Sequence, residues 1–267
     1  MVRETNADRR QLTLVIPAFN EEAGIQRAIA EAREALVDLD YDHEILVVDD
    51  GSSDATIERA QELATIWPGV RVLRHPVNRG YGAALRTGFA AARMPLVAFT
   101  DADCQFHLED LERLVPETDL APIVVGFRID RQDPWRRRFL SWGYNRVVRW
   151  LFDTGVRDCD CALKVFHREI VQDLLPNSDG FFVNTEMLAR ARRRGLEIRE
   201  VGVRHRPRRE GASKVSLWDV PKTLQTLVPF WWQLRAQPQA EPARPVPTLA
   251  LSRRDRLKKL ARKSVVS

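Results

Sequence analysis

Two carboxylates spaced two residues apart, Asp101 and Asp103, follow the apolar run 96–99. In an extended chain, residues i and i+2 point to the same side, so both carboxylates are expected to reach one divalent cation. Hard oxygen ligands suit Mg²⁺ or Mn²⁺, and such ions commonly bridge protein carboxylates to substrate phosphates. The motif therefore predicts a site that holds a nucleotide-diphosphate donor and stabilises the charge on its leaving group.

An isolated Asp-x-Asp is more often two solvated acids at a strand end than a metal site. The sequence upstream favours the metal site here. Apolar strand patterns at 12–16 and 43–48 also run into polar loops, and the second loop begins with Asp49, Asp50 and Gly51. In open parallel sheets, ligands bind outside the carboxyl ends of the strands. Three strands that deliver polar loops to one edge favour a shared site there.

The remaining periodicity predicts an α/β domain with a mainly parallel, Rossmann-like sheet flanked by helices. Helix-type patterns cover residues 23–39, 55–67 and 80–93, and short strands are expected at 70–73 and 123–126. The loop at 78–80 enters the third of these helices. It serves equally well as a helix start or as a phosphate contact, since helix N-termini do both.

Four segments together resemble the family 2 glycosyltransferases, most closely the branch that contains dolichyl-phosphate mannose synthase and related polyprenyl-phosphate sugar synthases. They are Val-Ile-Pro-Ala-Phe-Asn-Glu-Glu at 15–22, Val-Val-Asp-Asp-Gly-Ser-Ser-Asp at 47–54, Asn-Arg-Gly-Tyr-Gly-Ala-Ala at 78–84 and Asp-Ala-Asp-Cys-Gln at 101–105. The resemblance runs in the family's order over about residues 12–216. It implies a GT-A type fold, a nucleotide-sugar donor and an Mg²⁺ or Mn²⁺ ion.

The resemblance also implies roles for individual residues at the donor side. It places the metal on Asp103, with Asp101 and Gln105 assisting. The positions that resemble the family's donor contacts are Pro17, Phe19, Glu21, Asp50, Asp101, Ala102 and Gln105. Asp49, beside Asp50, is open to a structural role instead.

Acceptor contacts are implied in the segment 134–152, which mixes aromatic residues with arginines. Arg128 matches the arginine of a Gly-Ser-Arg-type motif, although Phe127 replaces the serine. Arg137 and Ser141 match an Arg-x-x-x-Ser pattern associated with the acceptor phosphate, and the run of arginines leaves Arg138 open as well. The segment itself is either a surface helix with snorkelling arginines or an acceptor helix at a membrane interface.

A basic loop near the end of the resemblance reads Arg-x-x-Gly-x-Ser-Lys, with Arg208, Ser213 and Lys214 at its specified positions. In the family this loop closes over donor and acceptor phosphates, whereas charge runs are more often solvated. A glycine hinge, a hydroxyl and a cation together favour phosphate binding. The groups expected to act in catalysis are Asp103, Arg128, Arg137, Arg208 and Lys214, and Ser213 is expected to bind the acceptor with Arg137 and Ser141.

Two further segments resemble family motifs. Residues 158–166 resemble a motif usually written with Ser-Gly-Phe before a basic residue, but here Cys-Ala-Leu precedes Lys164. Residues 180–186 resemble a segment in which an acid follows an aromatic strand. Glu186 is then expected in the first turn of a helix, where a negative charge complements the dipole.

Composition is compatible with one large α/β domain of 267 residues, and its net charge of +5 favours an anionic partner. The arginines lack a recognisable nucleic-acid module, so the expected partner is an anionic membrane surface or phosphorylated lipid rather than nucleic acid. Three cysteines are too few for a disulfide framework, which suggests a reducing compartment. The start shows no secretory signal pattern, and no apolar stretch approaches the roughly 20 residues that cross a bilayer.

The expected organisation is a catalytic domain at 1–216 and a C-terminal amphipathic extension at 217–267. The extension carries an aromatic patch at 224–234, a Pro-rich stretch at 237–247 and a basic amphipathic helix at 252–263. Several Lys and Arg near an anionic surface contribute about 1 kcal/mol each. Peripheral association with the cytoplasmic face of a membrane is therefore expected, with the oligomeric state left open.

The expected function is inverting, metal-dependent transfer of a hexose from a donor of the GDP-mannose or UDP-glucose type to a polyprenyl or dolichyl monophosphate. An ionised phosphate is already a nucleophile, so this acceptor needs no general base. The alternative is transfer to a sugar or protein hydroxyl, whose proton a nearby carboxylate would remove. A non-enzymatic nucleic-acid-binding protein is the third and weakest alternative.

Overall fold

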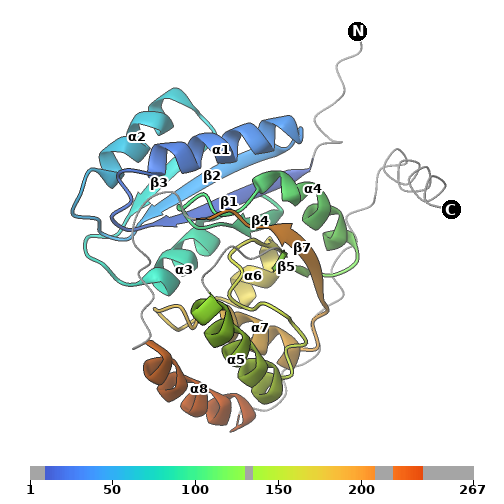
Figure 1. Cartoon of the computed structure of the whole chain (residues 1–267). Helices are drawn as coiled ribbons and strands as arrows, with labels where there is room; N and C mark the ends of the chain where they lie inside the picture. The colour runs from blue at the N-terminus through green and yellow to red at the C-terminus, as the bar shows by residue number, and fades with distance from the viewer. Residues whose placement is uncertain (1–9, 130–134, 208–218, 237–267) are drawn as a thin grey trace, which may run out of the picture.

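A seven-stranded mixed sheet, mostly parallel and flanked by helices, organises the computed structural model, which describes residues 10–129, 135–207 and 219–236 (Figure 1). The strand order across the described sheet is β3-β2-β1-β4-β6-β5-β7. Figure 1 shows α1 and α2 on one side of the sheet and α3 on the other. The predicted α/β architecture is confirmed.

The first half of the sheet is parallel and follows the predicted alternation. Its elements are β1 (Gln11–Ala18), α1 (Ile25–Asp38), β2 (Asp42–Asp49), α2 (Thr56–Ile66), β3 (Val70–Arg74), α3 (Tyr81–Ala91) and β4 (Leu96–Phe99). β1 pairs in parallel with both β2 and β4, with Ala18 opposite Asp49 and Val15 opposite Phe99. The carboxyl ends of these three strands consequently meet at one edge of the sheet.

The second half contains the antiparallel strand. Its elements are η2 (Leu108–Asp110), α4 (Leu111–Leu114), η3 (Val115–Asp119), β5 (Ile123–Ile129), α5 (Trp135–Phe152), β6 (Lys164–His167), α6 (Arg168–Asp173), α7 (Val183–Arg193), β7 (Ile198–Arg204) and α8 (Asp219–Ala236). β6 runs antiparallel between β4 and β5, whereas β5 and β7 are parallel. β6 and β7 were not anticipated from the sequence, because neither has a long apolar run.

Aromatic side chains fix α3 against the middle of the sheet. Phe89 of α3 lies 5.7 Å from Phe99 of β4 and 6.0 Å from Phe166 of β6, measured between ring centroids. All three side chains are buried in the main core. Burying each contributes roughly 2–3 kcal/mol relative to exposure. This packing fixes the position of α3 relative to β4.

The aromatic segment before α7 is not a strand, and that prediction is wrong. Residues 180–182 form a bend and a turn, and the backbone N–H of Val183 donates to the carbonyl of Gly180. A strand would need a neighbouring edge to satisfy its backbone groups, and this segment closes on itself instead. Phe181 stacks on Tyr81 at 5.2 Å. Glu186 does lie in the first turn of α7.

Helix α8, from the predicted C-terminal extension, packs onto the catalytic domain. Leu227 is fully buried, and Phe230 lies 5.6 Å from Phe152 of α5 and 5.1 Å from Phe182. The indole N–H of Trp231 donates to the carbonyl of Leu151 at 3.1 Å. The predicted boundary at 216/217, the Pro-rich stretch and the basic helix at 252–263 lie outside the described residues.

Candidate active site

The two carboxylates of the Asp-x-Asp motif lie just beyond β4, in a turn. The strand ends at Phe99, residues 102–103 form the turn, and Cys104 has a φ of 55°. The expectation that Asp101 and Asp103 share one side of an extended chain is therefore wrong, because the chain turns where the alternation of a strand would have to continue. The positions of the two carboxylates therefore depend on the residues that contact them.

The hydroxyl of Tyr81 contacts the first of the two carboxylates. It donates a hydrogen bond to Oδ1 of Asp101 at 2.9 Å. Burial raises the pKa of Tyr81 well above its usual value, and the charges of Asp101 and, more weakly, Asp103 raise it further. The negative charges of both carboxylates therefore disfavour ionisation of the Tyr81 hydroxyl. Sequence reasoning missed Tyr81, although its place directly after Gly80 at a helix start was a signal.

Glycines let the first turn of α3 approach the chain that precedes α7. Gly80 has a φ of 98°, which strongly favours glycine, and a Cβ at Gly82 would collide with the carbonyl oxygen of Ser178. The backbone N–H of Gly82 donates to the carbonyl of Asp179 at 2.6 Å. Of the two roles expected for the loop at 78–80, the helix start is observed, and phosphate contact stays a prediction.

Asp50 holds the loop that enters α3. Its Oδ1 accepts from the backbone N–H of Arg79 at 3.0 Å and its Oδ2 from that of Gly80 at 2.7 Å. The Nδ1 of His75 lies 2.6 Å from Oδ1. Both oxygens of Asp50 thus contact the protein's own loop, and its donor contact stays a prediction. Asp49 is fully buried, as a structural role requires.

The loops that follow β1 and β2 are joined side by side. The backbone N–H of Asn20 donates to Oγ of Ser52 at 2.9 Å, and Oδ1 of Asn20 accepts from the backbone N–H of Ser53 at 2.9 Å. The backbone N–H of Glu21 donates to Oγ1 of Thr56 at 2.8 Å. These contacts, which the sequence did not reveal, place the predicted donor positions Pro17, Phe19 and Glu21 beside the Asp50 loop.

A short antiparallel contact links the Asp-x-Asp turn to the end of β7. The backbone N–H of Arg206 donates to the carbonyl of Gln105 at 2.7 Å, and Nε2 of Gln105 donates to the carbonyl of Arg206 at 3.2 Å. Gln105 and Ala102 are both buried. The predicted metal contact of Gln105 would therefore use its amide oxygen.

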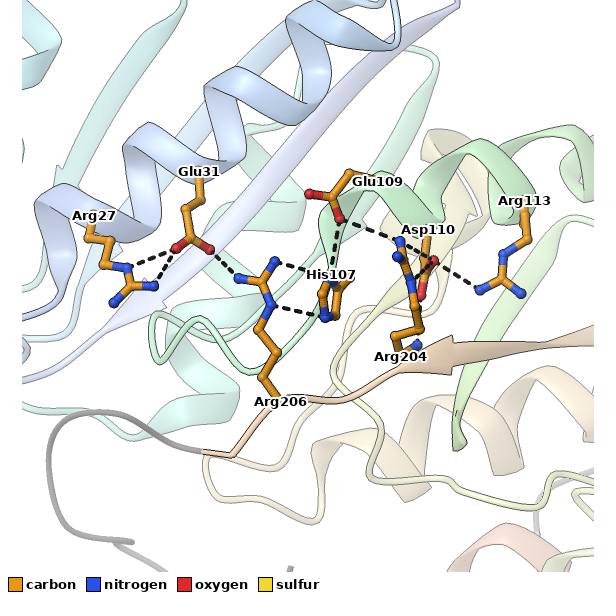
Figure 2. Close-up of polar contacts among 8 residues, drawn as sticks. All are labelled: Arg27, Glu31, His107, Glu109, Asp110, Arg113, Arg204 and Arg206. Carbon is orange, nitrogen blue, oxygen red and sulfur yellow. Dashed lines mark hydrogen bonds and ion pairs between the residues drawn. The ribbon is translucent and has the colours of Figure 1, made fainter. Parts of the chain in front are cut away.

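Arg206 is anchored by charged and polar neighbours (Figure 2). Its guanidinium lies 3.0 Å from Oε2 of Glu31 on α1 and 3.0 Å from the ring nitrogens of His107. Burial and the charge of Arg206 lower the pKa of His107, which favours a neutral ring beside a cation. Figure 2 also shows Arg204 and Arg113 on the buried Asp110. The predicted loop residues Arg208, Ser213 and Lys214 follow this anchor and lie outside the described residues.

Arg128 of β5 forms a buried ion pair with Asp158. Its Nε and one terminal nitrogen lie 2.7 and 2.8 Å from the two carboxylate oxygens. Burial opposes the charge of Arg128, but Asp158 raises its pKa above the ordinary value. The pair orients a guanidinium at the end of β5, whose predicted contact with a phosphate stays a prediction.

Helix α5 carries the other predicted acceptor contacts. Ser141 is half-buried, and its carbonyl accepts from the side chain of Asn145 at 2.8 Å. The side chains of Arg137 and Arg138 lie outside the described part of the chain. The structure therefore does not choose between the two arginines.

The donor set at the end of β4 fits a hard divalent cation. Asp101 and Asp103 are half-buried and offer carboxylate oxygens. Across the described residues, no group of three or more His, Cys, Asp and Glu side chains gathers as a metal site. Two protein carboxylates suit an ion that completes its coordination with substrate phosphates and water.

Comparison with known proteins identifies the family. Residues 13–175 match the family described as glycosyl transferase family 2, which is more than half of the chain. The chain belongs to glycosyl transferase family 2. This membership confirms the resemblance drawn from the order of the four sequence motifs.

Curated relatives in this family match most of the chain. A dolichyl-phosphate beta-glucosyltransferase of Trichomonas vaginalis is 34% identical over 208 residues, which are 72% of this chain and 64% of that protein. An undecaprenyl-phosphate 4-deoxy-4-formamido-L-arabinose transferase of Aeromonas hydrophila is 31% identical over 226 residues, covering 84% of this chain and 68% of that one. The chain thus spans about two thirds of the length of these relatives.

A solved structure supports the GT-A type fold expected for the family. Glucosyl-3-phosphoglycerate synthase from Mycobacterium tuberculosis, in complex with Mn²⁺, UDP and glucosyl-3-phosphoglycerate, superimposes with a TM-score of 0.66 at 25% identity. The likeness covers 86% of this chain and 82% of that one. The expected fold class is confirmed.

Proposed function

We propose that this family 2 glycosyltransferase transfers a hexose from a nucleotide-diphosphate sugar to a polyprenyl or dolichyl monophosphate, with inversion at the anomeric carbon. The observation that supports the proposal is the position of Asp101 and Asp103 just beyond β4, where Asp101 accepts from Tyr81, at the edge where β1 and β2 also end. The named relatives act on dolichyl phosphate and undecaprenyl phosphate. That shared chemistry supports a polyprenyl phosphate as the acceptor here.

The donor diphosphate would lie over the turn after β4. Asp103 and Asp101, with Gln105, would hold Mg²⁺ or Mn²⁺, and the Mn²⁺ and UDP in the similar solved structure support this choice. When bound, the ion offsets negative charge on the departing diphosphate. Ala102, Pro17 near the end of β1, and the joined loops that carry Phe19, Glu21 and Asp50 would contact the nucleotide.

The acceptor phosphate would attack from the opposite side. Its oxygen forms a bond to the anomeric carbon while the bond from that carbon to the donor phosphate breaks, and the nucleoside diphosphate leaves. Arginines are suited to hold the acceptor because a guanidinium grips a phosphate through two parallel hydrogen bonds. We assign this role to Arg128, oriented by Asp158, and to Arg137, Ser141, Arg208, Ser213 and Lys214.

A turnover assay tests the proposed function. The purified chain is incubated with GDP- and UDP-sugars, a polyprenyl phosphate and Mn²⁺, and lipid products are separated from unreacted donor. We expect one donor to give a polyprenyl-phosphate sugar. Transfer only to a sugar or protein hydroxyl would establish the alternative function instead.

We also infer that the protein binds peripherally to an anionic membrane at its cytoplasmic face, through an aromatic surface on α5 and α8. The exposed side of α5 carries Phe139, Trp142 and Trp150, spaced three and eight residues apart, and Trp150 is 83% exposed. The guanidinium of Arg146 lies 5.9 Å from the Trp142 ring centroid. Asn145, on another side of the helix, is buried.

Helix α8 extends this aromatic surface. Trp232 is 64% exposed and follows Trp231, which contacts the residue after Trp150. Arg235 lies over Trp231 at 4.2 Å. Exposed tryptophans beside arginines are typical of a membrane interface. Within the described residues, no helix has the length and apolar character needed to cross a bilayer.

Serine at both Trp150 and Trp232 is expected to weaken binding to vesicles that contain phosphatidylglycerol by about tenfold or more, since two interfacial anchors are lost. Binding should also weaken at high salt, because exposed charge attraction is screened. The matched control is Ile66→Ser, which changes a 64% exposed apolar residue on distant α2. Sedimentation with vesicles measures the effect, and equal binding by both variants would contradict this surface.

A further inference from the structure

His75 follows β3 directly and is buried. Its backbone N–H donates to the carbonyl of Asp49 at 2.8 Å, which continues the pairing of β3 with β2. Its ring lies between side chains from two other elements. Nδ1 is 2.6 Å from Oδ1 of Asp50, and Nε2 is 2.9 Å from Oγ1 of Thr87 on α3. The ring of His75 therefore connects the ends of β2 and β3 to α3.

Asp50 depends on this ring for one of its hydrogen bonds. The side chain of Asp50 is buried, and its carboxylate accepts from the backbone N–H groups of Arg79 and Gly80 as well as contacting His75. A carboxylate only accepts hydrogen bonds, so Nδ1 of His75 carries the proton in this contact. Burying a carboxylate with one donor fewer costs free energy. Removal of the imidazole would therefore destabilise the carboxylate in the position where it holds residues 79 and 80.

Thr87 contacts the other side of the ring. A hydroxyl group both donates and accepts, so Oγ1 of Thr87 satisfies Nε2 of His75 in either protonation state of the imidazole. With a partner at each nitrogen, the ring is held with Nδ1 directed at Asp50. Thr87 belongs to the helix that the loop at 78–80 enters. The positions of Asp50 and of α3 are therefore coupled through one side chain.

We propose that His75 is a positioning residue for donor binding, which acts through Asp50 and the loop at 78–80. Asp50 follows β2 at the edge where β1 and β4 also end, and the donor is proposed to bind at this edge. The hydrogen bond from His75 keeps the carboxylate where it fixes the backbone at the start of α3. This inference rests on the donor site of the proposed function.

The test measures the affinity for UDP and for GDP in the presence of Mn²⁺ by isothermal titration calorimetry, without any sugar transfer. His75→Leu should bind the nucleotide that the wild type prefers about tenfold more weakly, because a donor to the buried carboxylate is lost. His75→Asn should stay within about threefold, since the amide nitrogen of asparagine is as many bonds from the backbone as Nδ1 and also donates. A role in packing alone predicts the reverse order, because leucine suits a buried position better than asparagine.

The matched control is His167→Leu. His167 is also a buried histidine, and its Nε2 lies 2.9 Å from the carbonyl oxygen of Thr118. It pairs with Leu96 at the start of β4, away from the edge where the donor is proposed to bind. Its nucleotide affinity should stay within about twofold of the wild type, since distant substitutions act independently. Thermal unfolding of each variant shows whether it is folded at the titration temperature.

A second variant, Thr87→Val, tests the other side of the ring and decides the question if His75→Leu does not fold. Valine has nearly the shape of threonine but no hydroxyl, so Nε2 of His75 loses its partner. Nucleotide binding should weaken about threefold, because the ring is then held at one nitrogen only. Added to His75→Leu, Thr87→Val should weaken binding no further, since the side chain that couples Thr87 to Asp50 is already gone.

The outcomes separate this inference from the proposed function. Wild-type affinity in His75→Leu or in Thr87→Val, or an equal loss in His75→Leu and His75→Asn, would overturn the positioning role while the donor site stands. Failure of the wild type to bind both UDP and GDP would overturn the donor site and the inference with it. A loss in His75→Leu that neither His75→Asn nor His167→Leu shares supports both.

Discussion

Replacement of Asp103 by alanine is expected to lower sugar transfer by about 1,000-fold or more while the protein stays folded. Charge stabilisation by a bound metal supplies several kcal/mol, and each 1.4 kcal/mol corresponds to a tenfold change in rate. The fold should survive because Asp103 is half-buried in a turn. Its Oδ1 accepts there from the backbone N–H of Gln105 at 3.2 Å, a contact worth about 1 kcal/mol.

The measurement is turnover of the nucleotide sugar with polyprenyl phosphate, together with circular dichroism to check folding. EDTA should stop the wild type, and Mg²⁺ or Mn²⁺ should restore it. Asp38→Ala is the matched control, since Asp38 is an exposed acid at the end of α1, away from the edge where β1, β2 and β4 end. Full wild-type activity in metal-free buffer would show that the site works without a cation.

Polyprenol is expected to be inert where the corresponding polyprenyl phosphate is a substrate. Removing the phosphate removes the ionised nucleophile, and a hydroxyl in its place would need a base to take its proton. It also removes the group that the arginines are proposed to hold. Product formation from the two lipids and from simple sugars, compared at equal concentration, measures the preference. Equal transfer to polyprenol, or preferential transfer to a sugar, would promote the hydroxyl-acceptor alternative.

Arg137→Lys should separate acceptor binding from donor binding in the same assay. Lysine cannot reproduce the two parallel hydrogen bonds of a guanidinium, so the KM for polyprenyl phosphate should rise about tenfold or more. The KM for the nucleotide sugar should change little. Arg138→Lys is the matched comparison, because the sequence pattern leaves the register open. If neither variant changes the acceptor KM, the arginines of α5 do not hold the phosphate.

Local sequence was sufficient for the first half of the sheet. The runs that became β1, β2 and β4 are apolar and β-branched, and each is followed by a polar loop and a helix pattern. Parallel strands in that order must present their carboxyl ends at one edge, so the neighbourhood of Asp50 and Asp101 could be anticipated. The same ordered loops identified the family, because their motifs lie in contiguous segments.

Contacts between segments that are distant in the sequence could be seen only in the tertiary structure. β6 has four residues that include the buried Lys164, and only its neighbours β4 and β5 make it an antiparallel strand. The docking of α8 depends on Phe230 meeting α5 and the start of α7.

The hydrogen bonds of the site have the same origin. Tyr81 of α3 donates to Asp101 in the turn after β4, and Lys164 of β6 donates to Asn184 of α7. Both contacts join separate elements, so no local pattern could report them. The turn at Asp103 likewise replaced the extended chain expected from spacing. Sequence periodicity reports which side of its own element a residue faces, whereas a hydrogen bond between elements depends on how the whole chain packs.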